Sequence, residues 1–182
     1  MNYATIKNCD IANGPGVRVS LFVSGCTHRC KGCFNEIAWD FNYGEPFTEE
    51  TEDMLLSMLA PDHIKGLTLL GGEPFEPQNQ GPIVKFLRRV KERFPDKSIW
   101  AFSGYLFDKD LLSGRLGNKE LTLEYLSYLD VLVDGPFVME KKDLSLRFRG
   151  SSNQRLIHVP ESLKTGEIVL WEDWQGEKRG MK

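Results

Sequence analysis

The 182-residue sequence lacks the features of several broad protein classes. It contains no apolar run near the roughly 20 residues that a transmembrane helix needs, and its first residues lack the charged-then-apolar layout of a signal peptide. It also has no basic excess, because 23 Lys and Arg stand against 26 Asp and Glu, which gives a formal net charge of -3. We therefore expect a cytoplasmic protein with no membrane and no nucleic-acid partner.

Internal repeats, low-complexity segments and linker-like stretches are also missing from the sequence. Hydrophobic residues make up 41% of the chain, and its length suits one well-formed core better than two. We expect a single compact domain that spans residues 1–182.

Cysteine is scarce, but three of the four cysteines are close together in C-T-H-R-C-K-G-C, as Cys26, Cys30 and Cys33. This clustering does not suit a secreted disulfide framework and favours metal binding or catalysis. Three thiolates can hold three irons of a 4Fe-4S cluster and leave the fourth iron open, whereas an electron-transfer cluster takes four cysteines. A structural zinc site that adds His28 or Cys9 stays open as an alternative, although the sequence has no second cysteine pair.

Apolar runs of strand length alternate with segments of helical periodicity. We expect helices from Thr48 to Pro61, between residues 83 and 95 and at 121–129, and strands at 17–23, 67–70, 98–102, 131–133, 156–159 and 168–171. This alternation predicts an α/β fold with parallel strands. Because the chain is too short for eight units, an open partial (βα) barrel is favoured over a closed one. Trp171 and Trp174 are expected to pack at the edge.

Polar or glycine-rich motifs follow four of the expected strands. The cysteine loop, defined here as residues 26–33, follows the first strand, and Ser103 and Asp134 follow the third and fourth. The second strand leads into a G-G-E-P turn, which consists of Gly71, Gly72, Glu73 and Pro74. Because parallel strands present their carboxyl ends at one edge of a sheet, we expect all four motifs to share one face.

The cysteine spacing followed by the G-G-E-P turn resembles the radical S-adenosylmethionine superfamily. Five further segments narrow the resemblance: G-P-G-V-R at 14–18, C-F-N at 33–35, W-A-F-S-G-Y at 100–105, D-V-L-V-D-G-P-F at 130–137 and R-F-R-G-S-S-N-Q-R at 147–155. Together they resemble the anaerobic ribonucleoside-triphosphate reductase activating proteins, which belong to the glycyl-radical-enzyme activases. The likeness extends from about residue 10 to the late strands.

The resemblance implies two cofactors and a reaction. Cys26, Cys30 and Cys33 would bind a 4Fe-4S cluster, and S-adenosyl-L-methionine would chelate the open iron. An electron from a flavodoxin-like or other small reductant would cleave S-adenosylmethionine to methionine and a 5'-deoxyadenosyl radical. That radical would take a hydrogen atom from a glycine of the partner, the anaerobic ribonucleoside-triphosphate reductase. No catalytic residue is expected beyond the cluster and the cofactor.

The resemblance also implies cofactor-binding residues, namely Gly32, Cys33, Phe34, Gly71, Gly72, Glu73 and Pro74. Because Ser103 and Asp134 follow separate strands on the same expected face, they are candidates to hydrogen-bond the ribose or the methionine carboxylate region of the cofactor. Glu73 would accept a hydrogen bond from the methionine ammonium group, and the glycines would let backbone approach the ligand. Gly32 departs from the wider superfamily, in which an aromatic residue often precedes the third cysteine, but matches the activating proteins. The alternative for Phe34 is a core position, and for Ser103 and Asp134 it is a turn or cap role.

Basic residues late in the chain are implied partner contacts. Arg147, Arg149 and Arg155 could dock the glycine loop of the partner, and the alternative is a solvated turn. Arg18 could pair with Asp134 or with substrate, or lie exposed on its strand.

Three other functions remain open at this point. One is a small radical S-adenosylmethionine enzyme that acts on a small molecule, similar to a deazapurine synthase. Another is the activase of a different glycyl radical enzyme, such as pyruvate formate-lyase, whose activases share the cysteine loop and G-P-G-V-R. The third is a zinc-stabilised or electron-transfer module that is not an enzyme. The segment at 147–155 favours the reductase activase.

Overall fold

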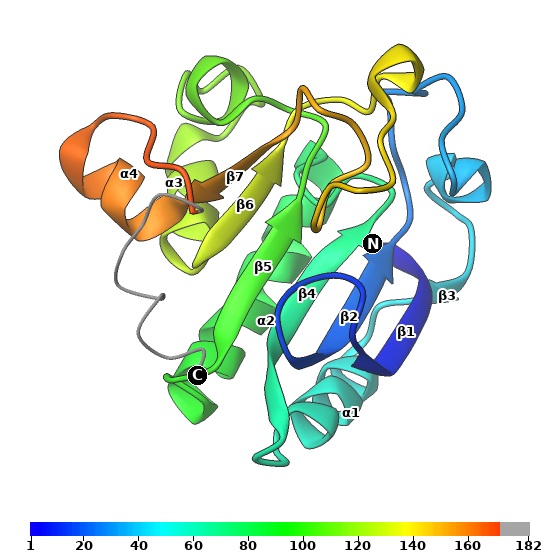
Figure 1. Cartoon of the computed structure of the whole chain (residues 1–182). Coiled ribbons are helices and arrows are strands. Elements are labelled where there is room, and N and C mark those ends of the chain that lie inside the picture. Colours follow the sequence, from blue (N-terminus) through cyan, green and yellow to red (C-terminus); the bar gives the residue numbers. More distant parts are fainter. Residues whose placement is uncertain (172–182) are drawn as a thin grey trace.

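A computed structural model describes residues 1–171, which build one seven-stranded sheet in the order β3-β1-β2-β4-β5-β6-β7 (Figure 1). The strands are β1 (Asn2–Asp10), β2 (Val17–Val23), β3 (Glu45–Pro46), β4 (Ile64–Gly71), β5 (Ser98–Phe102), β6 (Val131–Asp134) and β7 (Arg155–His158). The helices are α1 (Glu49–Leu59), α2 (Pro77–Arg93), α3 (Lys119–Ser127) and α4 (Val159–Thr165), with short helices η1 (Glu36–Trp39), η2 (Phe107–Leu111) and η3 (Met139–Lys141).

The centre of the sheet is parallel and its margins are antiparallel. Strands β2, β4, β5 and β6 pair in parallel, as the alternation of strands and helices predicts. Strands β1, β3 and β7 extend the sheet in antiparallel pairs. Within residues 1–171 the outer strands β3 and β7 do not pair with each other, so the sheet is open. The α/β prediction is therefore confirmed, while all-parallel pairing holds only for the central four strands.

Most predicted elements occur where the sequence indicates them. The bounds of β2 and β5 match the prediction, and α1 begins after Thr48, whose side chain caps it by accepting from the Thr51 backbone N–H. The strand predicted at 168–171 is wrong, because within residues 1–171 this segment pairs with β7 through an isolated bridge between Leu170 and Ile157 rather than through a strand of its own. The antiparallel strand β1 is absent from the prediction. Trp174 lies outside the described residues.

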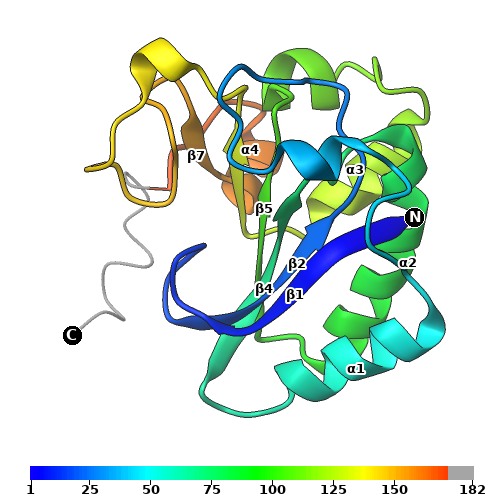
Figure 2. The same ribbon diagram turned by 90° about the vertical axis from the view of Figure 1, so that its right-hand side faces the viewer.

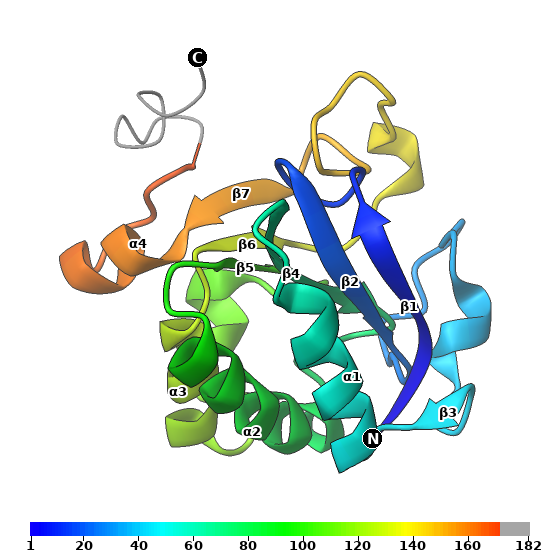
Figure 3. The ribbon, with the colours of Figure 1, turned by 90° about the horizontal axis from the view of Figure 1, so that it is seen from below.

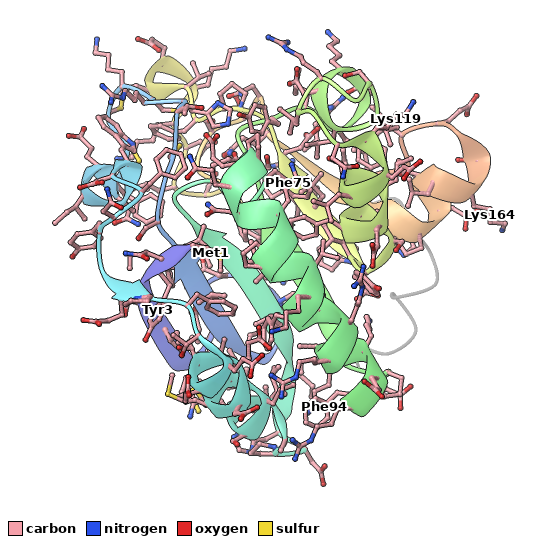
Figure 4. All side chains as sticks on the ribbon, turned by 180° about the vertical axis from the view of Figure 1, so that it is seen from behind. Met1, Tyr3, Phe75, Phe94, Lys119 and Lys164 are labelled. Atoms are coloured by element: carbon pink, nitrogen blue, oxygen red, sulfur yellow. The ribbon has the colours of Figure 1, made fainter. Side chains whose placement is uncertain are left out.

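The main core lies between the sheet and the helices α1, α2 and α3, which cover one face (Figure 3). Figure 4 shows α2 crossing this face from Phe75 to Phe94. Successive residues of a strand point to opposite faces, and on β5 Ile99 joins this core whereas Trp100 does not. Phe75, just before α2, stacks on Tyr125 of α3 with ring centroids 4.2 Å apart.

In the described part of the chain no helix has the length and apolar character to span a bilayer.

The opposite face carries a smaller aromatic cluster. Trp100 makes edge contacts with Phe148 and Trp171, with ring centroids 5.3 Å and 5.2 Å apart, so Trp171 packs as expected. Phe148 has a φ of 55°, a left-handed conformation that is uncommon for a bulky residue and needs support from its surroundings. The cluster thus anchors residues 137–150 against the sheet.

Arg18 is buried on this second face, so neither its expected pairing with Asp134 nor an exposed position is correct. Its guanidinium donates to the Thr68 hydroxyl at 2.7 Å, the Leu67 carbonyl at 2.8 Å and the Ser98 hydroxyl at 2.9 Å. A buried guanidinium is tolerated because several acceptors surround it. A Cβ on Gly14 would come within 2.8 Å of the Arg18 side chain, so the G-P-G-V-R segment folds closely over it.

Candidate functional site

Three of the cysteines line a single cavity at the carboxyl ends of the central strands. The cysteine loop leaves the end of β2, and Figure 2 shows it at the same end of the sheet as residues 137–150. The cavity has a volume of about 560 Å³, a size typical of small-molecule sites. Cys26, Cys30 and Cys33 all contribute to its wall, together with the glycines of the G-G-E-P turn.

The G-G-E-P turn packs directly on the start of the cysteine loop. Gly71 has a φ of 112°, and a Cβ there would lie 2.7 Å from the Val23 backbone. A Cβ on Gly72 would lie 2.5 Å from the Gly25 carbonyl oxygen. The Glu73 backbone N–H donates to that same carbonyl at 2.8 Å. Both glycines are therefore required by the close approach of two protein segments, in addition to any approach of a ligand.

The Glu73 carboxylate lies at the centre of the hydrogen-bond network around the cavity. Its side chain is 1% exposed, and one oxygen accepts from the Phe75 backbone N–H at 2.8 Å and from the Ser103 hydroxyl at 3.0 Å. The other accepts from the Gly104 backbone N–H at 2.7 Å and lies 2.9 Å from Nε2 of His28. The four acceptor positions of the carboxylate are thus occupied by groups from three different parts of the chain.

A second buried carboxylate, Glu76, also holds the cysteine loop and was missed by sequence reasoning. Its Oε1 atom accepts from the Thr27 backbone N–H at 2.7 Å and from the Thr27 hydroxyl at 2.6 Å. Asn79 of α2 donates to the carbonyls of Ser24 and Glu73, both at 3.0 Å. The only sequence signal for these roles is the position of Glu76 and Asn79 just after the G-G-E-P turn.

The surroundings of Cys26 and Cys30 favour neutral thiols. Burial raises the pKa of the Cys26 thiol to about 12, and the negative charges of Glu73 and Glu76 contribute to the rise. Burial also raises the pKa of Cys30. Burial alone would lower the pKa of His28, but its hydrogen bond with Glu73 and the charge of that residue raise it overall. Bound iron would supply the positive charge that converts such thiols to thiolates.

Several observations fit a cluster and an organic cofactor in this cavity. The donor set of three thiols in one wall suits iron in a 4Fe-4S cluster. Trp39 lines the same cavity, and its indole N–H is buried without a hydrogen-bond partner among residues 1–171. This donor is available to a ligand, and sequence reasoning did not identify it.

Among residues 1–171, no three His, Cys, Asp or Glu side chains converge as ligands of one metal ion.

The structure brings most of the expected site residues to the cavity. Those that line it are Cys26, Cys30, Gly32, Cys33, Phe34, Gly71, Gly72, Glu73, Ser103 and Arg149. Phe34 is 83% exposed, so its alternative as a core residue is wrong. The expected residues outside the lining are Pro74, Asp134, Arg147 and Arg155. Pro74 is buried in the turn, and Arg147 is exposed beside the cavity.

Asp134 and Arg155 form an ion pair with each other. Nε of Arg155 donates to Oδ1 of Asp134 at 2.9 Å, and a second nitrogen donates to Oδ2. The Phe107 backbone N–H donates to Asp134 at 2.8 Å, and Arg155 also bonds Asp108 at 2.7 Å. Because Asp134 is 0% exposed and bonded to several donors, the structure gives this carboxylate a role in joining β6, β7 and η2.

Comparisons with known proteins agree with this geometry. Residues 12–157 match the family model of the 4Fe-4S single cluster domain. The anaerobic ribonucleoside-triphosphate reductase-activating protein of Pasteurella multocida is 45% identical over 156 residues, which cover 85% of this chain and 95% of that protein. The protein of that name from Escherichia coli K12 is 42% identical over 87% of this chain and 99% of its own length. The one from Enterobacteria phage T4 is 45% identical over 86% and 93%. The chain belongs to the family of anaerobic ribonucleoside-triphosphate reductase-activating proteins and contains a 4Fe-4S single cluster domain.

Proposed function

We propose that this protein activates anaerobic ribonucleoside-triphosphate reductase by generating a glycyl radical in it, as an oxidoreductase of the radical S-adenosylmethionine type. The observation that carries the proposal is the shared cavity of Cys26, Cys30, Cys33 and the G-G-E-P turn. The names of the relatives support the reductase as the target. They favour it over pyruvate formate-lyase, over a small-molecule substrate and over a zinc-stabilised module. On this proposal the open sheet serves as the partial (βα) barrel of a cytoplasmic enzyme.

Each cofactor has residues that would hold it. The thiols of Cys26, Cys30 and Cys33 would bind three irons of a 4Fe-4S cluster. S-adenosylmethionine would occupy the cavity near Gly32, Phe34 and the G-G-E-P turn, with the Trp39 indole N–H as a further donor. When bound and reduced by one electron, these groups would supply methionine and a 5'-deoxyadenosyl radical for the removal of one hydrogen atom from a glycine of the reductase.

The residues of the chain itself orient the three thiols and exclude water from the site. Glu73 and Glu76 fix the cysteine loop through His28 and Thr27, so the three thiols keep their places relative to the cavity wall. The buried position of these contacts limits water beside the loop. The electron would come from a flavodoxin-like or other small reductant, which is part of the proposal.

Substitution of Cys30 tests the cluster. After anaerobic reconstitution with iron and sulfide, we expect Cys30→Ala to lose the brown 4Fe-4S absorbance and the reductive cleavage of S-adenosylmethionine, because one iron ligand is gone. Cys9→Ala is the matched control, since Cys9 is exposed and outside the cavity lining. Undiminished cleavage by the Cys30 variant would contradict the cluster assignment.

The target is tested with the cognate reductase. Mixing the reconstituted protein, reductant, S-adenosylmethionine and reductase should give the doublet of a glycine-centred radical in electron paramagnetic resonance. Cleavage of S-adenosylmethionine without this signal would refute the activase function and favour a small-molecule substrate.

A further inference from the structure

A second cavity borders the cysteine loop and has no part in the proposed function. Its volume is about 550 Å³, which is large enough for a small aromatic ligand. Cys26 and Trp39 line both cavities, whereas among the described residues Cys30 and Cys33 line only the first. Figure 1 shows the short helix η1, in light blue, at the margin of the molecule beyond β1. Cys26 and Trp39 therefore form the wall between the first cavity and this outer one.

Backbone hydrogen bonds hold this wall in place. The Cys26 N–H donates to the Trp39 carbonyl at 3.2 Å, and the Gly25 N–H donates to the Ala38 carbonyl at 2.8 Å. A Cβ on Gly25 would lie 2.1 Å from the ring of Phe41, so this ring packs closely on the backbone just before the cysteine loop. One hydrogen bond thus connects the wall of the second cavity to the residue that carries the Cys26 thiol. Short paths of covalent and hydrogen bonds are the paths along which electrons transfer fastest.

The first cavity is not free to receive an electron donor during the reaction. In the proposed function it holds S-adenosylmethionine and receives the target glycine, and a donor bound there would displace one of them. The second cavity is separate, so a donor bound in it leaves the first cavity accessible. It is therefore the better placed of the two for the electron to enter.

The apolar part of the second cavity suits a flat ring. Trp39 and Phe41 supply aromatic side chains to its lining, and Ile37 of η1 adds an aliphatic one. Ile37 is 58% exposed, so a ligand in the cavity would cover apolar surface that now faces water. Aromatic side chains also stack favourably on other planar rings.

The polar part of the lining carries both signs of charge. Arg29 is a donor, and Glu36 and Asp40 are acceptors, although one oxygen of Asp40 already accepts from the Asn42 backbone N–H at 2.9 Å. This balance selects neither an anion nor a cation. It suits a ring whose edges carry both carbonyl acceptors and N–H donors. The flavin ring is flat, carries both kinds of group and transfers single electrons.

We propose that the second cavity receives a reduced flavin ring, which delivers the electron to the cluster through the wall at Cys26. The inference rests on the proposed function, which consumes one electron for each S-adenosylmethionine cleaved. In this step the flavin loses one electron, the cluster gains it, and no bond forms or breaks. The ring is either free or carried by a small protein, and the two sources share the chemistry that the cavity recognises.

Rapid-freeze electron paramagnetic resonance of the reconstituted protein tests this cavity, because the reduced cluster is paramagnetic and the oxidised cluster is not. Ile37→Ser should lower the rate of cluster reduction by a reduced flavodoxin at least about fivefold, since an apolar contact with the ring is lost. Ile37→Val should keep the wild-type rate. Met54→Ser on α1 is the matched control, because Met54 is 39% exposed and lines neither cavity. Dithionite, which has no ring, should reduce all four proteins at the same rate.

The same measurement with free reduced flavin mononucleotide distinguishes the two sources. Slower reduction of Ile37→Ser by flavodoxin alone would support a ring carried by a protein, and slower reduction by both would support recognition of the ring itself. Wild-type rates of Ile37→Ser with both donors would overturn the second cavity as the place where the electron enters, even when dithionite drives cleavage of S-adenosylmethionine. Absence of dithionite-driven cleavage in the wild-type protein would instead refute the proposed function.

Discussion

Replacing Glu73 by Gln tests whether one buried carboxylate holds the functional site together. The change keeps the shape of the side chain but turns one of its two oxygens into an NH2 group that can only donate. In one orientation this NH2 faces the Phe75 backbone N–H, and in the other it faces the Gly104 backbone N–H. Neither backbone donor can turn away, although Ser103 and His28 can adjust their side chains. One buried N–H therefore loses its partner whichever way the amide lies.

The magnitude follows from the four contacts. An unpaired buried backbone N–H costs about 1–3 kcal/mol, and the remaining three hydrogen bonds each lose about 1 kcal/mol when the acceptor becomes neutral. We expect Glu73→Gln to lower the free energy of unfolding by about 4–6 kcal/mol. For a chain of this length, that loss corresponds to a melting temperature lower by about 8 °C or more.

Thermal unfolding of the metal-free protein, followed by circular dichroism, measures this effect without any contribution from a cluster. Glu49→Gln is the control, because the Glu49 side chain is 76% exposed and pairs only at the surface with Lys85. A Glu73→Gln variant that melts within about 2 °C of the wild type would refute the role of this carboxylate as a structural hub.

Two further predictions concern the glycine turn and the acid sensitivity of the fold. Gly71→Ala should destabilise the protein by at least about 2 kcal/mol in urea denaturation, because its positive φ and the Val23 backbone leave no room for a Cβ. Gly117→Ala, which shares a positive φ of 99° but has, among the described residues, no atom beyond its chain neighbours within 4 Å of the added Cβ, should cost less, and equal effects of the two would contradict the packing. Burial opposes ionisation of Asp10, but hydrogen bonds from Ser20 and neighbouring groups outweigh it and lower its pKa below 3.8. The stabilisation that ionised Asp10 provides is therefore fully present above pH 3.8 and is lost as the pH falls through the lowered pKa. The difference in free energy of unfolding between the wild type and Asp10→Asn should accordingly shrink below pH 3.8. A difference that stays constant with pH would disprove this link between the Asp10 pKa and stability.

The sequence predicts the parts of the fold that depend on local pattern. The strands β2 and β5 are short runs rich in branched and aromatic residues, and their bounds follow from composition. The convergence of the cysteine loop and the G-G-E-P turn follows from a general property of parallel strands, whose carboxyl ends meet at one edge. By contrast, β1 has a polar sequence, and its strand conformation comes from backbone pairing with β2.

The residues that sequence reasoning misjudged depend on contacts between distant segments. Glu76 bonds Thr27 across 49 residues, and no local pattern encodes that pairing. The position of Arg18 in a strand suggests an exposed or ion-paired side chain, but the hydroxyl groups of Thr68 and Ser98 accept hydrogen bonds from it and make its burial possible. The place of Asp134 after a strand predicts a position near the cofactor, but it does not reveal the ion pair that Asp134 forms with Arg155 across the sheet.

These contacts also explain why the cysteine loop and the G-G-E-P turn are informative as a pair. The absence of a side chain on Gly71 and Gly72 lets the backbone of Val23 and Gly25, which leads into the loop, come close. The Glu73 backbone N–H then bonds the Gly25 carbonyl, and its carboxylate bonds His28 inside the loop. A turn with other residues would neither admit the loop nor hold it. Since three thiols can bind one cluster only when the loop keeps its shape, the turn acts on the metal site through the position of the loop, whatever contacts it makes with a cofactor.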